Sequence, residues 1–410
     1  MKLLIFGEVF IPPAYLTRVR YFCSYLVNKG WDIDLIHESS ENHIYIPEKI
    51  STLSIDYVKS KKSIATKIDW LFKFFLNLVY DHKGRYFYKK SQSFIEGKQY
   101  DLVFCSSSFT FPLTVAARVA KDKNIPLFVD LRDIAEQSPN DYHYLSIQPP
   151  KLIGNLITAI YKNININRRN SVLKVANGIT TVSPWHVQTL LKYNPNTHLI
   201  YNGFDEAIFS PDKIKTERFT ISYFGRVYNE DMRNPRLLFS ALQSLNKKGL
   251  VDVDNTVIKW FLDENSKIII QKMAKEYGIE NFVEYHSFVK PENLQTEMNR
   301  SSILLVLCNT ATKKKYFGIM TTKFFEALGA NRPILCIPNN NDNLSELMNQ
   351  TNCGLVSSDT TEVEAFLLNK FNEWKETGHT NGTLDESVRM NFSRKKGAEI
   401  LEKLFLEAIK

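Results

Sequence analysis

Thr321, Thr322 and Lys323 stand directly before a run whose apolar spacing predicts a helix. A helix start offers backbone N–H groups, and two hydroxyls and a cation add further donors for a diphosphate. Glu326 lies one helical turn beyond Thr322 on the same face. Its carboxylate could accept hydrogen bonds from a ribose diol. Residue types alone fit a capped helix with a surface glutamate equally well.

A second candidate is the Gly225-Arg226 pair, which follows the apolar run 219–224 and precedes Arg233. Glycine lets a backbone approach a ligand closely, and arginine presents a planar fork of donors that suits phosphate oxygens. Taken alone, such a pair after a strand is usually a turn with a solvated arginine.

In the first half, Arg132 and Asp133 follow the apolar run 127–130. Open α/β sheets bind ligands at the carboxyl ends of their strands, so Asp133 could face an acceptor hydroxyl and Arg132 an acidic group. The alternative is a buried Asp–Arg pair that fixes the loop. Gly7 opens a proline-containing loop, 7–13, and is a further candidate.

These residues need elements to position them, and apolar runs alternate with helix-length amphipathic segments along the whole chain. The pattern predicts two doubly wound, Rossmann-like α/β domains, each a parallel sheet with helices on both faces. We expect strands at 3–6, 33–37, 102–105, 127–130, 179–182, 199–202, 219–224, 256–262, 282–286, 303–307, 333–337 and 354–356. We expect helices at 17–28, 111–121, 235–246, 266–277, 292–299 and 322–329.

With 410 residues, the chain exceeds what one hydrophobic core usually supports, which favours two domains facing a cleft. The stretch 205–217 contains Pro211 and several charges but little periodicity, and the second series of strands begins after it. We therefore predict one domain at 1–210 and another at 211–391.

The composition excludes several classes of protein. A hydrophobic content of 44% and a charged content of 23% suit a folded chain, not a disordered or fibrous one. The five cysteines stand alone, and neither a CxxC nor an Asp-x-Asp motif indicates a metal site, so we expect no metal and no cofactor. The lack of a GxGxxG fingerprint argues against a nicotinamide dehydrogenase. The isolated cysteines and the lack of a secretory leader favour a cytoplasmic location.

Two basic, aromatic segments, 59–90 and 151–174, contribute much of the net charge of +8. Cations and bulky apolar residues at helical spacing are typical of helices that lie in a membrane interface. This predicts peripheral attachment to the inner membrane face and a lipid-linked acceptor. The alternative is a pair of amphipathic helices packed on the first domain. No recognised nucleic-acid-binding module is present, so we expect no nucleic-acid partner.

The run Lys323-Phe-Phe-Glu326-Ala-Leu-Gly-Ala-Asn-Arg-Pro333 resembles the C-terminal signature of GT-B glycosyltransferases, especially family four, also called group 1. The resemblance implies that Glu326 binds the ribose of a nucleotide sugar. The family has a second glutamate eight residues earlier, which contacts the transferred sugar, but this chain has Gly318 there.

Other segments of the chain resemble motifs of the same family and occur in the same order along the sequence. The family's Gly-Arg pair implies a phosphate role for Gly225 and Arg226, while its usual lysine position is Asp231 here and leaves Arg233 as a substitute. The resemblance also places Phe288 and Val289 near the base, and Gly7 near donor phosphate or acceptor. Its final helix, 392–410, is expected to cross back onto the first domain.

The resemblance implies a retaining, metal-independent glycosyltransferase of the bacterial surface-polysaccharide type, acting in capsule, O-antigen lipopolysaccharide or exopolysaccharide biosynthesis. The donor would be a UDP- or GDP-linked sugar and the acceptor a lipid-linked saccharide. Arg226, Lys323 and Asp133 are the catalytic candidates. Two alternatives stay open: a non-hydrolysing sugar-nucleotide epimerase, and a non-catalytic GT-B scaffold subunit, which Gly318 and Asp231 suggest.

Overall fold

The strands are short apolar runs buried on both faces, as parallel sheets covered by helices require. In the first strand, Leu3 and Ile5 pack in one hydrophobic cluster, whereas Leu4 and Phe6 pack in another. Successive side chains of a strand point to opposite faces, so the sheet has a core on each side. The computed structural model describes residues 1–9, 17–39, 49–57, 63–107, 110–137, 151–229, 232–309 and 318–410.

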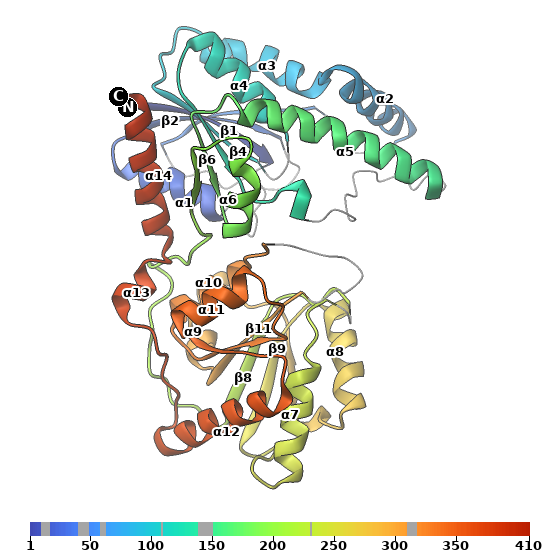
Figure 1. Ribbon diagram of the computed structural model, residues 1–410, viewed down its shortest axis with the longest axis vertical. Coiled ribbons are helices and arrows are strands. Elements are labelled where there is room, and N and C mark those ends of the chain that lie inside the picture. The colour runs from blue at the N-terminus through green and yellow to red at the C-terminus, as the bar shows by residue number, and fades with distance from the viewer. Residues whose placement is uncertain are drawn as a thin grey trace. The chain divides into compact units, whose positions relative to one another are not determined.

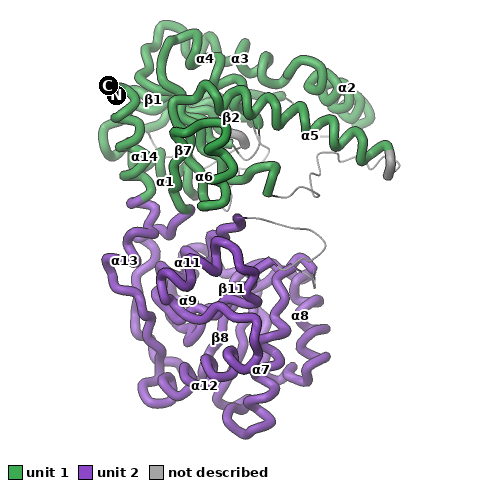
Figure 2. The backbone as a smooth tube through the Cα atoms, viewed as in Figure 1, with its two compact units in different colours: residues 1–201, 397–410 green, residues 202–396 purple. Residues whose placement is uncertain are grey.

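The chain divides into two units (Figure 2). Unit 1 comprises residues 1–201 and 397–410, and unit 2 comprises residues 202–396. Unit 2 is therefore continuous in sequence, whereas unit 1 consists of two segments, one before and one after unit 2.

In the described part of unit 1, seven parallel strands pair in the order β3-β2-β1-β4-β5-β6-β7 (Figure 1). The strands are β1 (Lys2–Val9), β2 (Asp32–Glu38), β3 (Ser51–Ile55), β4 (Leu102–Ser107), β5 (Leu127–Leu131), β6 (Gly178–Thr181) and β7 (Thr197–Leu199). The helices are α1 (Thr17–Asn28), α2 (Ile64–Tyr80), α3 (His82–Ile95), α4 (Leu113–Lys123), α5 (Lys151–Leu173), α6 (Pro184–Leu191) and α14 (Arg394–Ile409), with a 3-10 turn η1 (Ala135–Gln137).

In the described part of unit 2, six parallel strands pair in the order β10-β9-β8-β11-β12-β13. The strands are β8 (Phe219–Phe224), β9 (Thr256–Phe261), β10 (Val283–His286), β11 (Ile303–Leu307), β12 (Ile334–Ile337) and β13 (Gly354–Val356). The helices are α7 (Arg236–Lys247), α8 (Glu264–Glu276), α9 (Pro291–Asn299), α10 (Thr322–Ala330), α11 (Asn343–Thr351), α12 (Thr360–Thr377) and α13 (Glu386–Met390), with a 3-10 turn η2 (Glu280–Phe282). The predicted doubly wound α/β architecture is confirmed in both units.

The units divide after Tyr201, earlier than the predicted boundary after residue 210. The reason is Phe204, which is fully buried and packs so closely on Gly329 of α10 that a Cβ there would lie 2.7 Å from its ring. Its N–H donates to the Phe392 carbonyl at 3.1 Å, and its carbonyl accepts from the Arg394 N–H at 2.7 Å. The segment after Tyr201 therefore packs on the second core.

The final helix, α14, begins at Arg394 instead of the predicted residue 392. Ala398, Leu401 and Phe405 of α14 pack in the unit 1 cluster that also contains Leu3 and Ile5. Unit 1 thus resumes at Gly397, within α14.

Candidate active site

The sheet of unit 2 has a switch point between β8 and β11, because the strand order runs outward in both directions from this pair. Loops that leave a switch point in opposite directions open a crevice at the carboxyl ends of the strands. Gly225 and Arg226 follow β8, and Asn309 lies shortly after β11. A backbone bridge between Met232 and Asn309 joins the two loops. The predicted Gly225-Arg226 pair therefore lies where such a sheet binds ligands.

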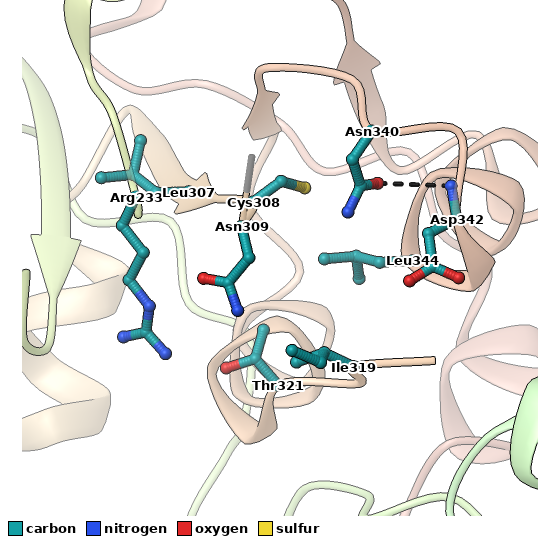
Figure 3. A pocket seen from close by; sticks show the side chains of 9 residues that line it. All are labelled: Arg233, Leu307, Cys308, Asn309, Ile319, Thr321, Asn340, Asp342 and Leu344. Atoms are coloured by element: carbon teal, nitrogen blue, oxygen red, sulfur yellow. Dashed lines mark hydrogen bonds between the residues drawn. The ribbon is translucent and has the colours of Figure 1, made fainter. Parts of the chain in front are cut away.

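A pocket with a cavity volume of about 20 Å³ opens at these loops (Figure 3). The side chains that line it come from the loop after β8, the ends of β11 and β12, and the start of α10 and α11. They are Arg233, Leu307, Cys308, Asn309, Ile319, Thr321, Asn340, Asp342 and Leu344. Of the residues singled out from the sequence, Arg233 and Thr321 line this pocket directly.

Lys323 of α10 lies over Gly225, which brings two of the predicted segments together. A Cβ built on Gly225 would lie 2.0 Å from Cε and 2.9 Å from Nζ of Lys323. Gly225 also has a φ of +145°, a backbone conformation that other residues rarely adopt. The loop after β8 thus needs glycine both for its conformation and for the lysine that crosses it.

The lysine ammonium lies in a cationic and largely enclosed setting. Burial lowers the pKa of Lys323, and Arg233 and Arg226 lower it further, while Glu326 acts in the opposite direction. Lys323, Arg233 and Arg226 repel one another, so a bound polyanion would relieve that repulsion. This electrostatic arrangement suits a diphosphate.

Thr321 is the N-cap residue of α10, with φ −67° and ψ 136°. Within the described part of the chain, its side chain makes no capping hydrogen bond to the helix. Its hydroxyl lines the pocket instead, and the first N–H groups of α10, from Thr322 onward, lie beside it. The predicted phosphate-binding helix start is consistent with this geometry.

The two arginines have different roles in the observed structure. Arg226 is exposed, its Nε lies 3.0 Å from Oδ2 of Asp263, and its guanidinium carbon lies 5.7 Å from the centre of the Phe288 ring. Arg233 has a positive φ of 63°, and its Nη1 donates to the Arg226 carbonyl at 2.9 Å. This bond aims Arg233 at the pocket, whereas Arg226 lies at its rim.

Glu326 occupies the half-buried face of α10. Burial raises the pKa of its carboxyl group, while Lys323 and Arg394 lower it. The carboxyl is therefore close to two cations but poorly hydrated, a setting in which ligand hydroxyls would provide hydrogen bonds that water does not.

Phe288 and Val289 follow β10, and Phe288 is exposed. Next to them, three rings stack across neighbouring strand ends, which the sequence analysis did not single out. The ring centres of Phe224 and Phe261 are 4.6 Å apart and these two rings are nearly parallel. The ring centres of Phe261 and His286 are 5.0 Å apart. Their position at the ends of β8, β9 and β10 could be found only once the strand order was known.

In unit 1, Asp133 is exposed and Arg132 is partly buried after β5. A buried acid–base pair in this unit joins Arg18 of α1 to Asp130 of β5, with the charged atoms 3.0 Å apart. Arg18 also donates to the carbonyls of Ile200 and Tyr201 at 2.6 and 2.7 Å. This network anchors the end of the first chain segment of unit 1.

Gly7 lies near the carboxyl end of β1, paired in register with Ser106 of β4. The strand order of unit 1 reverses between these two strands, so Gly7 stands at the switch point of the first sheet. The other residues of the predicted loop 10–13, and Ser108, Asp231 and Lys313 to Lys315, lie outside the described residues.

The described residues contain no group of three or more His, Cys, Asp or Glu side chains arranged to hold a metal ion. Across the same ranges, no helix combines the length and the apolar character needed to span a bilayer.

No protein-family model matches the chain, and no curated protein is similar to it. Solved structures are similar over its whole length. HepE from Anabaena, in complex with UDP-glucose, covers 99% of this chain and is itself covered fully, with a TM-score of 0.61 at 13% identity. A glycosyltransferase from Rickettsia africae ESF-5 covers 100% of this chain and is itself covered to 99%, with a TM-score of 0.61 at 13% identity. WaaG, a glycosyltransferase involved in lipopolysaccharide biosynthesis, covers 99% of this chain and is itself covered to 98%, with a TM-score of 0.55 at 12% identity.

The chain has the GT-B fold. In this GT-B chain, the predicted donor residues Gly225, Arg233, Thr321 and Lys323 come together around the switch point of unit 2. Asp133 belongs to the other unit, unit 1. Sequence reasoning missed Asn340 and Asp342, which line the same pocket. The clue available was their place after an apolar run, where a strand of the second sheet ends.

Proposed function

We propose that the protein is a glycosyltransferase that moves a sugar from a nucleotide-diphosphate sugar to an acceptor. The observation that carries the proposal is the pocket at the switch point of unit 2, where Arg233 and the start of α10 meet beside Lys323. A polar pocket with converging cations and helix N–H groups is suited to a diphosphate. The similarity in fold to HepE, which was crystallised with UDP-glucose, supports a nucleotide-sugar donor.

The chemistry follows from where charge develops. When the bond between the anomeric carbon and the diphosphate oxygen breaks, negative charge grows on the leaving diphosphate. Lys323, Arg226 and Arg233 would stabilise that charge without a metal ion. Glu326 would hold the ribose hydroxyls, and the backbone of Phe288 and Val289 would contact the edge of the base.

We further propose that configuration at the anomeric carbon is retained. The acceptor oxygen would bond on the face that the diphosphate leaves, and the acceptor proton would pass to an oxygen of the leaving phosphate. Asp133 would orient the acceptor hydroxyl from unit 1, where Gly7 lies at the other switch point.

An exposed apolar stripe supports a lipid-linked acceptor in surface-polysaccharide biosynthesis at the inner membrane face. Ile64, Ile68, Phe72, Phe75 and Val79 of α2 recur every three or four residues, and each is at least half exposed. A soluble protein rarely exposes a helical stripe of this kind without a partner. Exposed apolar residues on α5 extend it: Ile153, Leu156 and Ile160.

The helices α2 and α5 contact each other. The rings of Phe74 in α2 and Tyr161 in α5 stack with their centres 5.1 Å apart. Lys67 on α2 is exposed beside the stripe and adds a positive charge suited to anionic lipid.

The first test is calorimetric titration with UDP, GDP, ADP and TDP, followed by a transfer assay with the matching nucleotide sugar. We expect one diphosphate to bind, and Lys323→Met to weaken it by about ten-fold or more because a desolvated cation is lost. Lys267→Met on the surface of α8 is the control and should bind normally. Turnover of the donor to an epimer without an acceptor would instead support an epimerase, and absence of any diphosphate binding would support a scaffold subunit.

A further inference from the structure

The pocket of unit 2 has two chemically different ends. Arg233 lies at one end, near Lys323. The other end has no described cation among its lining residues and is built from Asn340 and Asp342, which belong to the loop between β12 and α11. Cations suit a diphosphate, so this second end requires a different part of the ligand.

Asp342 is held in place by two backbone N–H groups. Its Oδ1 accepts from Asn343 at 2.8 Å, and its Oδ2 accepts from Gly318 at 2.9 Å. An ionised carboxylate offers about four lone-pair sites, so each oxygen can accept one further hydrogen bond. Gly318 has a φ of +63°, which directs its N–H to the carboxylate. Asp342 is thus a fixed acceptor at the edge of a pocket.

Asn340 supplies donors beside that acceptor. Its Oδ1 accepts from the Asp342 N–H at 3.3 Å (Figure 3). It also accepts from Oγ of Ser345 at 3.0 Å. These two bonds occupy the carbonyl side of the amide and fix its orientation, which leaves the NH₂ group as the donor presented to the pocket. A rigid donor next to a rigid acceptor matches neighbouring hydroxyls on a sugar ring.

The remaining walls of the pocket combine apolar and polar groups. Ile319 and Leu344 contribute apolar surface, and Asn309 and Thr321 contribute further hydrogen-bonding groups. A hexose has hydroxyls around its edge and C–H groups on its faces, so it needs walls of both kinds. The site lies in the same pocket as Arg233, as expected for a sugar joined to a diphosphate.

We propose that this end binds the sugar of the donor, with Asp342 accepting a hydrogen bond from a sugar hydroxyl and Asn340 donating to its neighbour. The inference rests on the proposed function and assigns the specificity-determining residues within it. Asp342 then provides the carboxylate that is missing at position 318, where the glycine N–H holds Asp342 instead.

The test compares two ligands of one protein. Asp342→Asn keeps the shape and one acceptor but loses the charge, and Asn340→Asp keeps the carbonyl acceptor but loses the donors. For each variant, calorimetry gives the Kd of the diphosphate that binds best among UDP, GDP, ADP and TDP. It also gives the Kd of the tightest-binding sugar conjugate among UDP-glucose, UDP-galactose, GDP-mannose, ADP-glucose and TDP-glucose.

We expect both variants to keep diphosphate affinity within about two-fold and to weaken the sugar conjugate by about ten-fold or more. Asp359→Asn is the matched control, because Asp359 caps α12 in the same way, accepting from Thr361 and Glu362 N–H groups. It should change neither Kd. If Asp342→Asn does not fold, as judged by circular dichroism, Asn340→Asp decides by the same comparison.

Outcomes of two kinds overturn the inference, and they can be told apart by how the unaltered protein binds its ligands. Equal weakening of the affinity for both ligands, or no weakening for either, contradicts the sugar subsite but leaves the proposed function standing. Failure of the unaltered protein to bind any diphosphate or sugar conjugate contradicts the proposed function, and the subsite with it.

Discussion

Gly225 shows how a single residue constrains the candidate site. Lys323 fills the space that any other side chain at position 225 would need, and the backbone there has a positive φ. The position of the Lys323 ammonium therefore depends on the absence of a side chain at position 225, in the loop after β8. A lysine held in this way needs little ordering when a diphosphate binds, which favours affinity.

We predict that Gly225→Ala will weaken diphosphate binding by about ten-fold or more and destabilise the protein by about 1–3 kcal/mol. The new Cβ would lie 2.0 Å from Cε of Lys323, so the lysine must move. Thermal unfolding and calorimetry measure the two effects. Gly249→Ala is the control, because Gly249 also has a positive φ of 69° but meets no described atom within 4 Å. A loss of binding in the control as well would contradict the steric argument.

His186 gives a prediction for stability against pH. Its Nδ1 lies 3.1 Å from Oγ1 of Thr181 and its Nε2 lies 3.1 Å from Oε1 of Gln137, and burial lowers its pKa to about 4. The His186 side chain therefore gains a proton near pH 6.5 in the unfolded chain but only near pH 4 in the folded protein. Stability is fully present above pH 6.5 and falls by up to about 3 kcal/mol as the pH drops through this window. Denaturant titrations at several pH values should show this loss reduced in His186→Gln.

Of the individual residues that form the site, the sequence could predict only some. Lys323 and Thr321 were recognisable because a helix start has a local signature. Asp342 and the Arg18–Asp130 pair were not, because each contact joins residues far apart in the chain. Spacing in sequence carries no information on which loops meet, so such contacts require the strand order.

Among the elements, α2 stands out because its apolar stripe faces outward. Its Ser63 N-cap forms a capping box with Thr66, so the helix start has its own local stabilisation. Phe74 is its described buried residue, while Ile64 and Val79 are more than three-quarters exposed. An element with most of its apolar residues outside the core can bury them against a lipid surface.

We predict that the protein binds vesicles containing anionic phosphatidylglycerol, and that Ile68→Asp combined with Phe72→Asp lowers the bound fraction about ten-fold or more. Each lost apolar side chain removes about 1.5–3 kcal/mol of burial, and each new carboxylate is repelled by the lipid. Vesicle flotation measures binding. Ile268→Asp, on an exposed position of α8, is the control. Equal binding by the double variant and the unaltered chain would contradict interfacial attachment.

Element prediction missed the helices α11 and α12 and one edge strand. The strand β3 was not predicted, because Ser51, Thr52 and Ser54 are mostly exposed there and interrupt its apolar pattern. The buried strand β11 was predicted with its observed bounds, 303–307. Strands such as β6 and β7 shift by one or a few residues, because hydrogen bonding to neighbours, not local sequence, sets where a strand ends.

For the whole molecule, α14 determines whether unit 1 has a closed core. Phe405 is fully buried, and its ring centre lies 5.3 Å from that of Phe104, 5.2 Å from that of Phe128 and 6.0 Å from that of Trp31. Glu402 accepts hydrogen bonds from Trp31 at 3.1 Å and from Tyr25 at 3.2 Å. A helix from the end of the chain therefore seals the cluster built by the first strands.

We predict that Phe405→Ala destabilises unit 1 by about 3–5 kcal/mol, since a large buried ring leaves a cavity among three aromatic partners. Calorimetric unfolding should show the loss, with diphosphate binding by unit 2 retained at low temperature. Lys403→Ala on the exposed side of α14 should change stability by less than about 0.5 kcal/mol. A parallel loss of diphosphate affinity in Phe405→Ala would contradict the independence of the two units.

The division of the chain also has a consequence for its synthesis on the ribosome. Residues 202–396 form one unbroken stretch and can fold as soon as they emerge. The cluster that contains Leu3 and Phe104 must wait for Leu401 and Phe405, which are translated only after the whole of unit 2. Throughout elongation, the nascent first unit would expose this apolar surface, which makes it the part of the protein most dependent on chaperones.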